Sequence, residues 1–131
     1  MSPGVGFLVF LGVTLVLLGG VVATGYAAKR KQHLTLVFFA VTSLLTTIYF
    51  AEKLGTLYDL ESAGWIYPVH LAFAKTTTVA YLAPIVLGWI TMRRPTMLLW
   101  HRRAAFTVLF LTVCTAATGA WMLLAADKLP A

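Results

Sequence analysis

The chain is poor in charged residues and in the residues that build soluble catalytic sites. Only 11% of its 131 residues are charged, whereas soluble domains average about a quarter. A single cysteine, Cys114, excludes an internal disulfide and a C-x-x-C metal or redox pair. The sequence has no Gly-rich phosphate loop, nucleophile elbow or zincin helix, so we expect no enzyme activity.

Hydrophobic residues are abundant instead. They make up 60% of the chain and gather in four long runs. A water-soluble fold of this size has no means of burying so much apolar surface, whereas about 20 apolar residues cross a bilayer. The sequence therefore predicts an all-α integral membrane protein, an up-down bundle of four transmembrane helices over residues 4–28, 33–54, 65–92 and 102–126. Residues 1–131 are expected to form this single domain.

The few charges are distributed unevenly between the predicted loops. Lys and Arg number ten against four Asp and Glu, which gives a net charge of +6. The loops after the first and third spans are basic, while the loop after the second is acidic. Because basic loops stay in the cytoplasm, we expect them inside a bacterial inner (plasma) membrane and both termini outside. Anionic lipid headgroups, rather than nucleic acid, are the expected partners of these cations.

Polar residues inside the third predicted span, 65–92, point to a site. Ionisable groups within a span usually face another helix or a wet cavity, and this span carries His70 and Lys75. Glu52 ends the second span at a similar predicted depth. His70 with Glu52 suits a metal such as copper or zinc at the outer side, and adding Lys75 suggests a metal or proton conduit. The alternative is a structural ion pair between Glu52 and Lys75. Pro84 should kink this span.

His33 and His101 form a second candidate set. Each opens a predicted span on the cytoplasmic side, so the two lie at similar depth. Two histidines on facing helices at one depth can hold a b-type haem through its axial positions. The alternative is a pair of interfacial histidines beside lipid phosphates.

Several short motifs place these histidines in a recognisable pattern. Lys31-Gln32-His33, His70, His101-Arg102 and Thr118-Gly119 resemble the CtaM-like small four-helix membrane proteins, which are linked to cytochrome c oxidase maturation. The resemblance covers residues 29–124 and matches all three histidines to histidines of that family. It implies a haem-copper oxidase or its assembly machinery as partner. The family often has another histidine where this chain has Glu52, which argues against a histidine-only metal site there.

Three functions follow from these patterns. The leading hypothesis is a non-catalytic small membrane subunit or assembly factor of a respiratory redox complex, within a larger membrane assembly. The second is a b-type haem electron-transfer protein using His33 and His101. The third is the metal or proton conduit through Glu52, His70 and Lys75.

Overall fold

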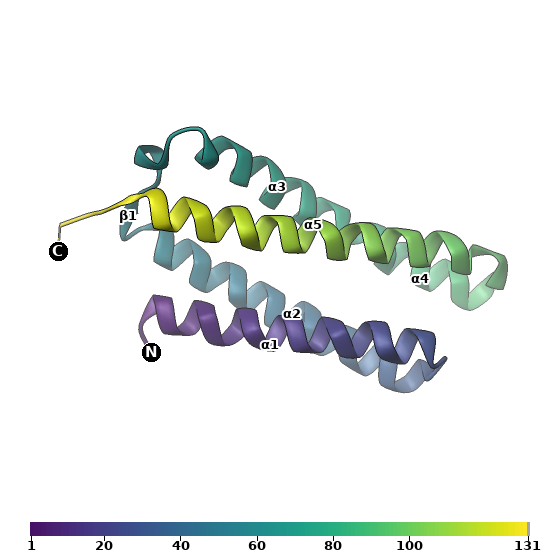
Figure 1. The fold of residues 1–131 in the computed structure, drawn as a ribbon. Coiled ribbons are helices and arrows are strands. Elements are labelled where there is room, and N and C mark those ends of the chain that lie inside the picture. Colours follow the sequence, from purple (N-terminus) through teal and green to yellow (C-terminus); the bar gives the residue numbers. More distant parts are fainter. Residues whose placement is uncertain (131) are drawn as a thin grey trace. The chain divides into compact units, whose positions relative to one another are not determined.

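The computed structural model describes residues 1–130, which group into two compact units, one of residues Met1–Tyr58 and one beginning at Asp59. We call them the first and the second hairpin. In the first hairpin, α1 (Pro3–Tyr26) and α2 (Arg30–Gly55) lie side by side, joined by a tight turn (Figure 1). Ser2 caps α1 with its side-chain oxygen, and Pro3 follows at the first helical position, where its missing N–H is harmless.

The turn between α1 and α2 is a Schellman motif built on an alanine. Lys29 N–H donates to Thr24 O over 3.1 Å, and Ala28 N–H donates to Gly25 O. Ala28 takes the left-handed position with φ of 55°. Glycine usually occupies this position, because a Cβ there crowds the following carbonyl. The turn therefore closes at a conformational cost.

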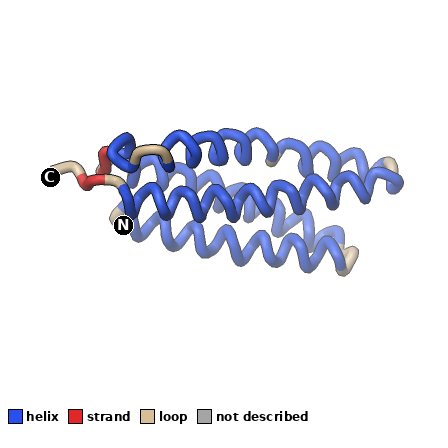
Figure 2. The backbone as a smooth tube through the Cα atoms, turned by 45° about the horizontal axis from the view of Figure 1, so that its top comes forward, coloured by secondary structure: helices blue, strands red, loops and turns tan. Residues whose placement is uncertain are grey.

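The second hairpin combines long helices with short capping elements. Figure 2 shows these helices with two-residue strands at one end. Strand β1 (Tyr58–Asp59) spans the boundary between the two units, and the second hairpin continues with η1 (Leu60–Ala63), α3 (Ile66–Ala80), α4 (Leu82–Arg93), η2 (Pro95–Met97), α5 (Leu98–Ala125) and β2 (Asp127–Lys128). Both α3 and α4 pack against α5. Strand β2 pairs with β1, and the Asp127 N–H donates to Ser62 Oγ over 2.8 Å.

The third span is interrupted at Tyr81, between α3 and α4. The cause is Pro84, which has no N–H to donate to the carbonyl of Ala80. The predicted irregularity in this span is thus present, and it lies one turn before the proline.

Each long helical segment suits a bilayer. Within residues 1–130, the segments long and apolar enough to span a membrane are Pro3–Tyr26, Arg30–Gly55, Ile66–Arg93 and Pro95–Ala125. Their surfaces are apolar too: Leu124 is 89% exposed and Val16 76%. Lipid rather than water is the solvent that favours such side chains. The chain is a membrane protein, and its all-α architecture is compatible with the predicted bundle of four spans.

The predicted helix ends differ from the observed ones mainly at the basic turns. The second helix was predicted from residue 33 and begins at Arg30, and the fourth was predicted from residue 102 and begins at Leu98. Charged residues were assigned to loops, but Lys and Arg are good helix formers and continue the helices. His33 and His101 therefore lie inside the first turn of their helices.

Candidate functional site

The three histidines are each held by a neighbouring helix of their own hairpin. In the first hairpin, His33 of α2 reaches back to α1. Its Nδ1 lies 2.9 Å from Val21 O, with Thr24 Oγ1 at 3.5 Å. Val21 O is the main acceptor for the imidazole because it is the closer of the two oxygens, and the Thr24 hydroxyl itself donates to Gly20 O over 2.8 Å.

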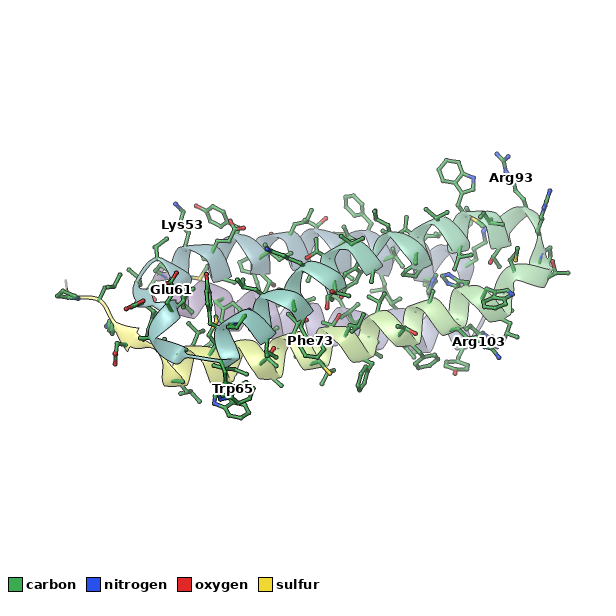
Figure 3. The ribbon with its side chains drawn as sticks, turned by 90° about the horizontal axis from the view of Figure 1, so that it is seen from above. Lys53, Glu61, Trp65, Phe73, Arg93 and Arg103 are labelled. Carbon is green, nitrogen blue, oxygen red and sulfur yellow. The ribbon has the colours of Figure 1, made fainter. Side chains whose placement is uncertain are left out.

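His101 has the same construction in the second hairpin. It lies in the first turn of α5 and reaches back to α4, with Nδ1 3.0 Å from Pro84 O. Figure 3 shows Arg93 and Arg103 at this end of the second hairpin, where α4 turns into α5, and Trp65 towards the other end. His101 therefore lies at the basic end of its hairpin.

His70 is held further along the second hairpin, about one turn inside the start of α3. Its Nδ1 lies 3.1 Å from Thr118 Oγ1 on α5. The Thr118 hydroxyl donates to Cys114 O over 2.8 Å, so its oxygen can accept from the imidazole, and the ring also hydrogen-bonds to the backbone of Thr115. Near this end, Trp65 and Trp121 pack edge to face with ring centroids 5.1 Å apart.

These bonds determine which imidazole nitrogen bears the proton. A carbonyl oxygen only accepts, so Nδ1 must donate in His33 and His101, and the committed Thr118 proton assigns His70 the same way. In each neutral ring the lone pair is then on Nε2. A histidine that ligates a metal through one nitrogen usually donates the other N–H to a carbonyl or similar acceptor. All three rings are thus in the form that a metal ligand needs.

A glycine lies beside each ring. A Cβ placed on Gly25 would lie 3.3 Å from His33 Cε1, and one placed on Gly88 would lie 3.2 Å from His101 Cε1. On Gly119 the distance to His70 Cε1 would be only 2.8 Å. The absence of a side chain at these positions lets each imidazole enter the groove between two helices. The glycines therefore set the ring positions as much as the hydrogen bonds do.

Hydroxyl groups also lie between the paired helices of both hairpins. In the first hairpin Thr14 is 1% exposed and bonds to Ser43 Oγ at 2.8 Å and Thr47 Oγ1 at 3.1 Å. In the second hairpin Thr77 pairs with Thr115, and Tyr81 with Thr112, each at 2.8 Å. Threonines in an apolar helical sequence can bond to carbonyls of their own helix or across helices, and both kinds of bond occur. Nothing in the sequence distinguished Thr14 or Tyr81, because their partners come from another helix.

The other predicted site residues lie in different hairpins. Glu52 is exposed on α2 of the first hairpin, and Lys75 is exposed on α3 of the second. The predicted ion pair of Glu52 with Lys75 and the predicted metal site of Glu52 with His70 therefore stay predictions. Within residues 1–130, no group of three or more His, Cys, Asp or Glu is placed to hold a metal ion.

Comparisons of this chain with protein-family models, with curated proteins and with solved structures found no match. The resemblance to the CtaM-like proteins stays a prediction.

Proposed function

We propose that the chain is a non-catalytic small membrane subunit or assembly factor of a respiratory redox complex, and that its histidines are ligands for a metal-containing group. One observation supports this proposal above the others. His33, His101 and His70 all lie with Nδ1 against an oxygen acceptor of a neighbouring helix, which is the tautomer that metal-ligating histidines commonly have.

The remainder of the chain fits an accessory role. The helices expose broad apolar surfaces that meet lipid or the spans of a larger complex. We place the basic turns in the cytoplasm and the protein in the inner membrane of a bacterium, following the charge distribution. The expected partner is a haem-copper oxidase or its assembly machinery, as the family resemblance implies.

The partner is tested by purifying the tagged full chain from membranes under mild detergent and identifying what accompanies it. We expect a respiratory redox complex, with its characteristic optical spectrum, in the purified fraction. A triple variant, His33→Ala with His70→Ala and His101→Ala, tests whether the histidines matter for assembly of that complex. Recovery of no redox protein, together with normal oxidase maturation in the variant, would contradict the proposal.

The second candidate, a b-type haem electron-transfer protein with His33 and His101 as axial ligands, stays a prediction, because the two residues lie in different hairpins. It is favoured by the close similarity of the two residues, each within the first turn of its helix and each bonded through Nδ1 to a backbone carbonyl. The bond to the carbonyl orients the ring and raises the basicity of Nε2, as a ligand to iron requires. The haem would supply reversible one-electron chemistry at this point.

The haem candidate is tested by the absorption spectrum of the protein purified from haem-replete cells. We expect a Soret band typical of low-spin iron with two histidine ligands, lost in both His33→Ala and His101→Ala. Gln32→Ala is the matched control, because it changes the exposed neighbour of His33 and should leave the band in place. A folded, colourless wild-type protein would rule this candidate out.

The conduit through Glu52, His70 and Lys75 also stays a prediction. Metal or proton flux into proteoliposomes should be abolished by Glu52→Gln if it is correct. Equal flux for this variant and the wild type would leave the carboxylate without a transport role.

A further inference from the structure

The turn between α4 and α5 gathers arginines at one end of the second hairpin. Arg93, Arg94 and Arg103 are exposed there, and each guanidinium carries a permanent positive charge. The sequence has no Asp or Glu between Glu61 and Asp127. Figure 3 shows Glu61 near one end of this hairpin and Arg93 and Arg103 near the other. The negative charge that balances these arginines must therefore come from outside the hairpin.

The backbone of this turn is ordered by hydrogen bonds. Arg93 ends α4, and Arg94 follows in an extended conformation with φ of −133°. The Arg94 N–H donates to Ile90 O over 2.8 Å, and the Arg94 carbonyl accepts from the Met97 N–H over 3.0 Å. Both polar backbone groups of Arg94 are thus bonded, while its side chain stays exposed. A ligand at this turn meets cations attached to an ordered backbone, which lowers the entropy cost of binding.

Arg103 is oriented by an aromatic ring, and apolar side chains surround this end of the two helices. The Arg103 Cζ lies 5.4 Å from the centre of the Trp100 ring, a contact that leaves guanidinium N–H groups able to donate. Leu99 and Trp100 of α5 are each 56% exposed, and Trp89 of α4 is 62% exposed. Cations beside exposed apolar side chains match a molecule that joins a phosphate to hydrocarbon chains, rather than a free phosphate ion.

The type of cation separates this turn from that of the first hairpin. The first turn carries Lys29 and Lys31, whereas Arg93, Arg94 and Arg103 are all arginines. An ammonium group attracts phosphate as a point charge, while a planar guanidinium donates two parallel hydrogen bonds to phosphate oxygens. Both turns attract an anionic membrane surface, but the arginines of the second also suit specific recognition of a phosphate.

We propose that the turn between α4 and α5 binds the phosphate of an anionic phospholipid through Arg93, Arg94 and Arg103. The acyl chains of this lipid lie against the exposed apolar side chains of the two helices, and its phosphate supplies the negative charge that residues 62–126 do not contain. The site differs from a general attraction of basic turns to membranes, because the guanidinium groups of one turn carry the recognition. It depends neither on the histidines nor on a respiratory partner.

The experiment reconstitutes the purified full chain in phosphatidylcholine bilayers and measures its association with spin-labelled phosphatidylglycerol by electron paramagnetic resonance. Spin-labelled phosphatidylcholine is the reference lipid. We expect the wild type to prefer phosphatidylglycerol, and the double variant Arg93→Gln with Arg103→Gln to lose that preference. Lys29→Gln with Lys31→Gln is the matched control, because it removes the same charge from the other turn and should keep the preference.

Two further measurements separate phosphate recognition from charge, and lipid from free phosphate. The triple variant Arg93→Lys with Arg94→Lys and Arg103→Lys keeps every charge at exposed positions, yet should lose most of the preference because lysine donates no paired bonds. Excess glycerol 3-phosphate should leave the labelled lipid in place, because it offers a phosphate without acyl chains.

Four results would each overturn the proposal. They are a wild-type chain with no preference for phosphatidylglycerol, an equal loss of preference in the two double variants, full preference in the lysine variant, and displacement of the labelled lipid by glycerol 3-phosphate. None of these measurements involves a metal or a redox complex, so failure here is distinct from failure of the proposed function.

Discussion

The two hairpins are alike at one end and different along their length. At the turn between their long helices, His33 and His101 occupy the same helical position, and each bonds through Nδ1 to the carbonyl four residues before a glycine. The connecting turns themselves differ, since one is a Schellman motif on Ala28 and the other contains η2 (Pro95–Met97). The hydrogen bond of the histidine is therefore alike in the two hairpins, although the turns that precede it differ.

Away from the turn, the two hairpins differ in the contacts between their paired helices. The first hairpin has uninterrupted helices and one compact hydroxyl cluster around Thr14. The second has an interruption at Tyr81 and a series of polar pairs, Tyr81 with Thr112, Thr77 with Thr115 and His70 with Thr118. Polar contacts therefore run along the second hairpin from Tyr81 to His70.

The largest expected effect concerns the packing of the first hairpin. A Cβ on Gly6 would collide with the Phe50 ring, with Cγ only 2.8 Å away, and that ring is itself stacked on Phe10 at 5.6 Å. We expect Gly6→Ala to destabilise the protein by about 1–3 kcal/mol in denaturant titration, the usual cost of overpacking. Gly12→Ala is the control, because nothing lies within 4 Å of the added Cβ. Equal stability of the two variants would mean that the α1–α2 seam is looser than described.

The next prediction compares the hydroxyl contacts of the two hairpins. Thr14→Val removes a hydroxyl with two partners on α2 besides Phe10 O of its own helix, whereas Thr77→Val removes one with a single partner on α5. Interhelical hydrogen bonds in membranes contribute about 0.6 kcal/mol on average and up to about 1.7. We expect Thr14→Val to lower the free energy of unfolding in bicelles by close to the upper value. Thr77→Val should lower it by close to the average.

Matched controls exist for both substitutions. Thr42 and Thr78 are exposed and donate only to carbonyls of their own helices, Phe38 O and Ala74 O. Thr42→Val and Thr78→Val should therefore be close to neutral. If Thr78→Val lowers the free energy of unfolding as much as Thr77→Val does, the loss comes from a hydroxyl bond within the helix and not from the contact between helices.

A stabilising change is expected at the turn of the first hairpin. Ala28→Gly relieves the left-handed conformation at φ of 55° and should raise the free energy of unfolding by about 1 kcal/mol. Ala27→Gly, one position earlier at φ of −73°, should not stabilise. If Ala28→Gly lowers the free energy of unfolding instead, the backbone strain at Ala28 is smaller than the stabilisation that its side chain provides.

The smallest effects are expected for the cation–ring contacts near the helix ends. Lys53 Nζ lies 5.9 Å from the Tyr49 ring centre in the first hairpin, and Arg103 Cζ lies 5.4 Å from the Trp100 ring centre in the second. Both pairs are exposed, so replacing either cation by methionine should change thermal stability less than the substitutions at Gly6, Thr14, Thr77 and Ala28. A larger loss for Arg103→Met than for Lys53→Met would follow from the shorter contact.

Much of the fold was predictable, and the details of the site were not. The positions of the spans, the interruption near Pro84 and the bonding of Thr42 and Thr46 to their own carbonyls are local consequences of the sequence. The partners of the histidines were not predictable. His70 was matched with Glu52, yet its observed bond is to Thr118, 48 residues further along the chain.

The sequence by itself determined that this protein consists of long apolar helices joined by short polar turns, because helix length and hydrophobicity are set residue by residue against the thickness of a bilayer. Only the tertiary structure decided which side of each helix faces its neighbour, since rotation about the helix axis depends on packing. That rotation put a glycine beside each imidazole and an oxygen atom at each Nδ1. The tautomer of each neutral ring follows from those contacts.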